Sequence, residues 1–218
     1  PVVAGAFLAL TGVLLVGDLK QPKRFVYLLT RGNRTSWLVK GAWVLAAFAA
    51  CLAAWWIAGL AGAGSALAAL VVPTVLLALG TAGYTAFLFG QCEGRDLWQE
   101  PLLLPVLVSQ AVMAGGAVYS LFDLFLDVPS HGAVKWAFLA GLVANAGLVA
   151  AELTGGHSRH VTMALAELRR GGQRKRYREF AFCTVFSLVF LGLDVIFGEI
   201  VFDWSGPVQP LVPLAALY

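Results

Sequence analysis

Charged residues are scarce in this chain. Only 12% of its 218 residues are Asp, Glu, Lys or Arg, whereas 60% are hydrophobic. A soluble globular domain has roughly 25% charged residues, which it uses to cover its surface. The scarcity therefore argues against a soluble catalytic domain. A bilayer removes the need for a polar surface, because the outer face of each helix meets hydrocarbon, so the composition predicts an integral membrane protein.

Cysteine and histidine are also rare, which limits the metal chemistry of the chain. The three Cys residues are widely spaced and form no CxxC or Cys/His pattern, so they are interpreted as small buried apolar residues. A membrane cytochrome b ligates haem with His side chains inside its helices. His131, His157 and His160 all fall in predicted loops, so no haem is expected on this chain. His157 and His160 lack a third ligand nearby and are only a weak metal signal.

Long apolar runs are abundant. A spanning helix needs about 20 apolar residues, and the runs that reach or approach this length are 1–16, 38–58, 66–90, 102–126, 134–153 and 180–202. They predict an all-α fold, a polytopic transmembrane bundle of about six helices that forms one domain over residues 1–218. The short apolar stretches at both ends are expected to be pieces of longer helices, so the chain is expected to be part of a larger subunit.

Basic residues are distributed unevenly between the two sides of the predicted bundle. With Lys40 included, 14 of the 15 Lys and Arg residues belong to loops 17–37, 91–101 and 153–179, and the other side has only Lys135. Cytoplasmic loops carry an excess of Lys and Arg. These three loops are therefore predicted to face the cytoplasm, with the protein in the inner membrane of a prokaryote. The charge is then a topology signal with some attraction to anionic lipid, and it requires no nucleic acid.

A few polar residues lie in or beside the apolar runs, where each costs a few kcal/mol unless it is partnered. Toward the basic loops lie Asp18, Tyr84, Gln110 and Glu152, with Arg24, Trp98, His157 and His160 in adjacent loops. Toward the other side lie Asp123, Asp194 and Glu199. An occupied site with part of a proton path would give this pattern. Helix-end residues that reach for headgroups would give it equally, and the residues alone leave both interpretations open.

A resemblance to a known family changes this balance. The first apolar run is followed by the pattern D-L-x-x-P-x-R-F over residues 18–25. It resembles the D-L-G-R-P-x-R-F motif of the NrfD-like family, the membrane subunits of polysulfide reductase and its relatives. Further features resemble the family in their order: Ser36-Trp37 with Gly41, Gly83-Tyr84-Thr85-Ala86, Trp98 with Pro101, and Glu152 before the polar stretch around His157. Lys20 and Gln21 depart from the motif, and family members commonly have eight or more helices.

The resemblance implies a haem-free membrane subunit of a respiratory oxidoreductase complex. Such a subunit binds quinone or quinol (menaquinone or ubiquinone), with no metal of its own. It exchanges electrons with an iron–sulfur partner subunit, which serves a catalytic subunit such as a molybdopterin enzyme. Quinone chemistry needs hydrogen-bond donors and a titratable group. The resulting candidates for quinone contact are Asp18, Tyr84, Arg24, Gln110 and His157, and those for a proton path are Glu152, Asp123, Asp194 and Glu199.

Two other functions remain as alternatives. A transporter would also explain acidic residues in the membrane, but transporters often contain repeated halves with interrupted helices. Pro73 and Gly80 interrupt one run, with no counterpart in another half. The second alternative is a structural anchor for a peripheral enzyme. It differs from a quinone-reactive subunit only in whether substitution of Asp18 and Tyr84 stops electron flow while assembly stays intact.

Overall fold

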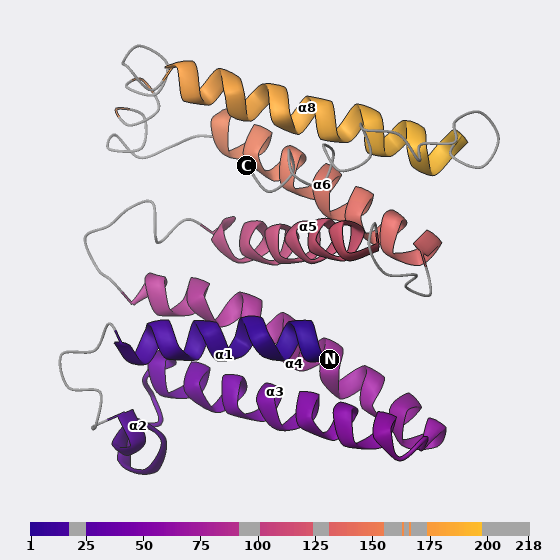
Figure 1. Cartoon of the computed structure of the whole chain (residues 1–218). Helices are drawn as coiled ribbons and strands as arrows, with labels where there is room; N and C mark the ends of the chain where they lie inside the picture. Colours follow the sequence, from indigo (N-terminus) through magenta and orange to yellow (C-terminus); the bar gives the residue numbers. More distant parts are fainter. Residues whose placement is uncertain are drawn as a thin grey trace. The chain divides into compact units, whose positions relative to one another are not determined.

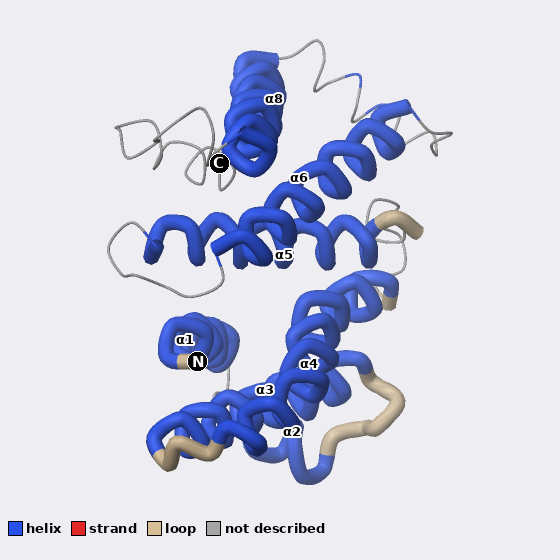
Figure 2. The backbone as a smooth tube through the Cα atoms, turned by 90° about the vertical axis from the view of Figure 1, so that its right-hand side faces the viewer, coloured by secondary structure: helices blue, strands red, loops and turns tan. Residues whose placement is uncertain are grey.

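The described part of the chain is helical. The computed structural model describes residues 1–17, 25–91, 101–123, 131–154, 163, 166 and 174–197, and Figure 2 shows no strand among them. This confirms the predicted all-α fold class. Contacts divide the chain into two compact units, Pro1–Cys92 (unit 1) and Glu93–Tyr218 (unit 2). The single domain over residues 1–218 stays a prediction.

Unit 1 is built around one long helix. Its described helices, labelled in Figure 1, are α1 (Val2–Gly17), α2 (Phe25–Arg31), α3 (Trp37–Leu60) and α4 (Gly64–Gly90). The helices α1, α2 and α4 all pack on α3. Because α1 and α4 both run antiparallel to α3, the C-terminal ends of α1 and α4 lie beside the start of α3. We call this the basic end of unit 1, since the predicted basic loop 17–37 begins there.

A tight turn joins α3 to α4 at the opposite end. Gly62 has φ of +64°, a conformation that glycine adopts without a steric penalty. The Gly62 N–H donates to the Gly59 carbonyl at 3.2 Å and the Ala63 N–H donates to the Ala58 carbonyl at 3.0 Å. These two bonds form a Schellman motif, which satisfies the last carbonyls of α3. The turn occupies only residues 61–63, so α3 and α4 both extend beyond the predicted runs 38–58 and 66–90.

Unit 2 packs three described helices through one apolar core. They are α5 (Leu103–Asp123), α6 (His131–Thr154) and α8 (Arg174–Phe197), and α6 contacts both of the others. Glycines bring α5 and α6 close together. A Cβ on Gly116 would lie 2.5 Å from the Phe138 Cβ, and a Cβ on Gly141 would lie 2.9 Å from the Met113 backbone nitrogen. The core beside these contacts consists of Ala117, Phe138, Leu142 and Leu191.

Four of the described helices are long and apolar enough to cross a membrane. They are α3, α4, α5 and residues Gly132–Glu152 of α6, while α1 is a shorter apolar helix. Large apolar side chains lie on their outer surfaces, with Leu60 76% exposed and Val13 of α1 68% exposed. Soluble monomers rarely expose extended apolar surfaces. A bilayer would cover these side chains, as expected of a polytopic membrane protein.

The predicted runs match six of the seven described helices; one helix was not predicted, and two helices start earlier than predicted. The sequence predicts a loop over residues 17–37, but Phe25–Arg31 forms α2, which is too short to span a membrane. His131, predicted in a loop, is the first residue of α6. The last run is predicted to start at residue 180, yet α8 starts at Arg174. Lys, Arg and Glu are good helix formers, and Lys175 pairs with Glu179 one turn later at 3.8 Å.

Candidate functional site

Tyr84 lies near the basic end of α4, where its ring packs directly on α3. A Cβ built on Gly41 would overlap the ring carbons Cδ2 and Cε2 of Tyr84. Gly41 is buried and Tyr84 is half-buried, so the missing side chain at position 41 provides the space for the ring. Within residues 25–91 no hydrogen bond engages the Tyr84 hydroxyl. The hydroxyl can therefore donate to a ligand.

Contacts at the basic end fix the register of α3 against α4. The Trp37 and Phe87 rings stack with centroids 4.2 Å apart and planes 13° apart. The backbone N–H of Trp37 donates to Gln91 Oε1 at 3.3 Å. The Lys40 ammonium lies 4.3 Å from the centroid of the Trp37 ring. These contacts set the depth of Tyr84, which precedes Phe87 by one helical turn.

A polar cluster holds the same two helices together further along α3. The Trp55 Nε1–H donates to Thr74 Oγ1 at 2.6 Å, and the Thr74 hydroxyl donates to the Leu70 carbonyl at 2.6 Å. Because this uses the only hydroxyl hydrogen, the thiol of Cys51 is the donor in its 3.2 Å contact with Thr74 Oγ1. Cys51 is buried, as predicted, and Cys183 is half-buried. Cys92 lies outside the described residues.

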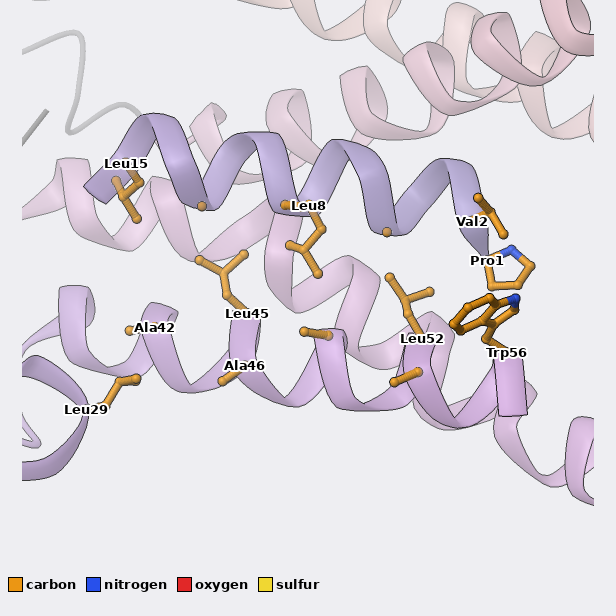
Figure 3. Close-up of a pocket in the computed structure, with 15 residues that line it drawn as sticks. Pro1, Val2, Leu8, Leu15, Leu29, Ala42, Leu45, Ala46, Leu52 and Trp56 are labelled. Carbon is orange, nitrogen blue, oxygen red and sulfur yellow. The ribbon is translucent and has the colours of Figure 1, made fainter. Parts of the chain in front are cut away.

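An apolar groove runs between α1 and α3. It has a volume of about 510 Å³, and Figure 3 shows Leu8, Leu45 and Leu52 pointing into the space between the two helices. Leu15 and Ala42 lie at its basic end, while Pro1 and Trp56 lie at the other end. All of its lining residues are apolar or glycine. Ala42 directly follows Gly41, so the basic end of the groove and the Tyr84 ring share one level of α3, about 100° apart around the helix axis.

Asp18 and Arg24, the first predicted quinone contacts, lie outside the described residues. The structure does place the residues that flank them. Gly17, which precedes Asp18, ends α1 at the basic end, and Phe25, which follows Arg24, begins α2. The chain therefore leaves and re-enters the described structure at the same end of unit 1 that holds Tyr84.

The other predicted residues belong to unit 2 or lie outside the described residues. Gln110 is exposed on α5, next to Ser109, which is buried. The Ser109 hydroxyl donates to the Val106 carbonyl at 2.8 Å and lies 3.5 Å from Oδ1 of the buried Asn145 on α6. Glu152, half-buried, lies two turns beyond Asn145, roughly 10 Å further along the axis. His157 and Glu199 lie outside the described residues.

Two of the predicted proton-path residues, Asp123 and Glu152, lie at opposite ends of the α5–α6 pair. Asp123 is the last residue of α5, and Glu152 is near the end of the antiparallel α6, so they lie roughly 30 Å apart along the axis. Between them, Phe138 and Leu142 are fully buried in the apolar core. Asp194 lies in the last turn of α8, but its side chain is outside the described part. The opposite depths predicted for Asp123 and Glu152 agree with the helices, and the proton path itself stays a prediction.

Tyr84 was predicted as a quinone contact and stays a prediction, whereas most of the residues that position its ring were not predicted. Gly41 entered through the family resemblance, whereas Phe87 and Gln91 were not singled out. Their helical spacing is the available signal, since residues three or four apart share one face. Tyr84, Phe87 and Gln91 lie on one face of α4 in this way. In the described residues, no group of three His, Cys, Asp or Glu side chains is placed to hold a metal ion.

A family of known proteins matches most of the chain. The family model of polysulphide reductase, NrfD, matches residues 2–202. The matched region includes all seven described helices and every residue predicted to contact quinone or to relay protons. No curated protein and no solved structure matches the chain.

Proposed function

Because the chain belongs to the NrfD family of polysulphide reductase, we propose that it binds quinone or quinol and exchanges electrons with an iron–sulfur subunit. Members of this family are membrane subunits of polysulfide reductase-like complexes, in which they work with iron–sulfur and catalytic subunits. Together with the four apolar spans, membership identifies the chain as an integral membrane protein. The proposal adds the ligand, its site and the electron transfer.

The observation that carries the proposal is that the Tyr84 ring packs on α3 at the same level as the basic end of the apolar groove. A quinone has a polar head with two carbonyl oxygens and an apolar isoprenoid tail. The Tyr84 hydroxyl is a donor without a partner among the described residues, and the groove of about 510 Å³ offers an apolar surface that starts at the same level. Ligand sites of this kind combine an apolar lining with a few placed polar groups. The residues present therefore fit a quinone with its head at the basic end.

The chemistry assigned to the site is proton-coupled. Full reduction of a quinone consumes two electrons, which we assign to the iron–sulfur partner, and two protons. Tyr84 donates a hydrogen bond to one carbonyl oxygen and orients the head. Asp18 would give the two protons in succession and would take up a proton from water between the two steps; in quinol oxidation the same steps would run in reverse, as a positioned carboxyl group allows. Arg24, Gln110 and His157 are proposed as weaker polar contacts.

The remaining assignments concern protons, partners and location. Glu152, Asp123, Asp194 and Glu199 are proposed to relay protons. The catalytic subunit is proposed to be a molybdopterin enzyme, and this chain is proposed to carry no haem. We place the protein in a prokaryotic inner membrane, with loops 17–37, 91–101 and 153–179 in the cytoplasm. What supports this orientation is the concentration of 14 of the 15 basic residues on that side.

The proposal is tested by removing the Tyr84 hydroxyl. Tyr84→Phe keeps the ring on Gly41 and removes one hydrogen bond, which is worth about 0.5–1.5 kcal/mol. The expected result is a roughly 2- to 13-fold lower kcat/KM for quinol-linked electron transfer in the assembled complex. Tyr27→Phe is the matched control, because Tyr27 is 55% exposed on α2. Equal rates for both variants and the native complex would count against a quinone head at Tyr84.

A further inference from the structure

The junction between α2 and α3 carries positive charge without a carboxylate nearby in sequence. Arg31 ends α2, Arg34 lies in the turn that follows, and Lys40 lies in the first turn of α3. Residues 25–91 contain no Asp or Glu. The N-terminus of α3 adds the positive end of the helix dipole, and its N-cap residue Ser36 makes no side-chain capping bond. This concentration of positive charge favours an anionic ligand.

A cleft of about 400 Å³ lies at this junction. Its lining combines two cationic side chains and a hydroxyl with apolar side chains: Arg34, Lys40, Thr30, Leu29, Val39 and Trp43. Trp43 is 57% exposed and lies one turn further along α3 than Lys40, toward the membrane interior. The lining thus changes from charged to apolar in the direction in which the helix enters the bilayer, which matches an amphiphilic ligand.

The ammonium group of Lys40 is positioned in advance. It lies 4.3 Å from the centroid of the Trp37 ring, a cation–π geometry. That ring stacks on Phe87, and the backbone N–H of Trp37 donates a hydrogen bond to the Gln91 side chain. A lysine that is already ordered loses less side-chain entropy when it binds an anion. Lys40 is therefore better prepared for a fixed ligand than a freely moving surface lysine.

We propose that this cleft binds the headgroup of an anionic membrane phospholipid. The phosphate lies between Arg34 and Lys40, and the acyl chains extend past Trp43 along the outer surface of α3. Basic groups at a membrane surface attract anionic lipids, and Trp favours the headgroup level. A soluble phosphate compound would leave the apolar part of the lining without a partner. The lipid site does not depend on quinone binding, although Leu29 lines both the cleft and the groove.

Native mass spectrometry of the purified complex tests the proposal. The complex is exposed in detergent micelles to an equimolar mixture of phosphatidylglycerol and phosphatidylcholine, and retained lipid is measured. Native protein should retain phosphatidylglycerol in preference. Arg34→Gln combined with Lys40→Gln should weaken retention by roughly fivefold for each cation removed. Lys175→Gln is the matched control, because this lysine is 87% exposed and pairs with Glu179 on α8, so retention should not change.

A variant that exchanges the two cations and a soluble phosphate probe extend the test. Arg34→Lys with Lys40→Arg keeps both charges, so this variant should fold and still retain the lipid. Unchanged retention in the Gln double variant, or equal retention of both lipids by the native protein, would overturn the proposal. Inorganic phosphate is the remaining probe, compared with chloride at equal ionic strength. If phosphate raises the thermal stability of the native protein but not of the Gln variant, the cleft is a site for a free phosphate compound and the lipid assignment is wrong.

Discussion

At the level of single residues, the most informative contact is the one between Tyr84 and Gly41. The absence of a side chain at position 41 lets an aromatic ring lie directly on α3. One turn nearer to the basic end, Trp37 and Phe87 stack across the same helix pair. Val44 lies one turn beyond Gly41 on α3 and faces Gly80 of α4. A Cβ on Gly80 would lie 3.2 Å from the Val44 side chain, so the missing side chain of Gly80 also lets the two helices pack closely. The depth and orientation of Tyr84 thus depend on neighbours that take no part in chemistry.

Gly41→Ala should destabilise unit 1 and displace Tyr84. The added methyl group overlaps the ring, and overpacking of this kind costs about 1–3 kcal/mol. Thermal unfolding of the purified protein would measure the loss. Gly59→Ala on the same helix is the control, because a Cβ there meets nothing within 4 Å, and it should be neutral or slightly stabilising. Equal stability of the two variants would mean that the Tyr84 ring is not held against α3.

Thr74→Val should weaken the α3–α4 pair without touching the basic end. The substitution leaves the Trp55 Nε1–H and the Cys51 thiol without their acceptor. Side-chain hydrogen bonds between membrane helices are worth about 0.6 kcal/mol on average and up to about 1.7 kcal/mol. The free energy of unfolding in detergent should fall by an amount in this range.

Thr11→Val provides the comparison for Thr74→Val, because the Thr11 hydroxyl donates only to the Phe7 carbonyl of its own helix. Each variant loses one threonine hydroxyl from an apolar helix. A loss of stability at position 11 as large as that at position 74 would contradict the interhelical role of Thr74.

At the level of elements, apolar run length explains how much of the fold could be predicted. The six runs were recognisable because each spanning helix needs an unbroken apolar length. The sequence FVYLLTR of α2 is seven residues long, and no span criterion detects it. The first turns of α8 were missed for a related reason, because residues 174–179 are mostly charged. Helix pairing could not be predicted, since it depends on which glycines of two helices meet in three dimensions.

Gly141→Ala should separate α5 from α6. A Cβ at this position would lie 2.9 Å from the backbone nitrogen and 3.3 Å from the Cα of Met113. A backbone cannot move aside as a side-chain end can, so the helices must shift. The expected cost is about 1–3 kcal/mol of unfolding free energy, measured by thermal unfolding.

Gly115→Ala is the control for Gly141→Ala. Gly115 belongs to the same helix pair, but a Cβ there meets nothing within 4 Å. It should therefore leave stability unchanged or raise it slightly. A Gly141→Ala variant as stable as Gly115→Ala would show that the close approach of the two backbones does not contribute to the fold.

At the level of the whole molecule, the chain divides its polar residues between a small number of places in an otherwise apolar protein. The basic end of unit 1 holds Tyr84 and leads directly to Asp18, while the two ends of the α5–α6 pair hold Glu152 and Asp123. The family resemblance, now supported by a match over residues 2–202, was needed to predict a site from this pattern. From charge and spacing alone, polar residues at helix ends that reach for lipid headgroups would explain the pattern equally well. The geometry that places Tyr84 required the structure.

The measurement that tests the quinone-site account most directly is quinol-linked electron transfer in membranes that contain Asp18→Asn. Assembly with the partner subunits is verified first, by co-purification. Asn keeps the size of Asp but cannot exchange a proton, and general acid–base catalysis contributes about 10²–10⁴-fold to rates. The account predicts that transfer falls by about 100-fold or more while assembly stays normal. Unchanged transfer in the assembled variant would contradict a proton-coupled quinone site at Asp18 and favour a structural anchor.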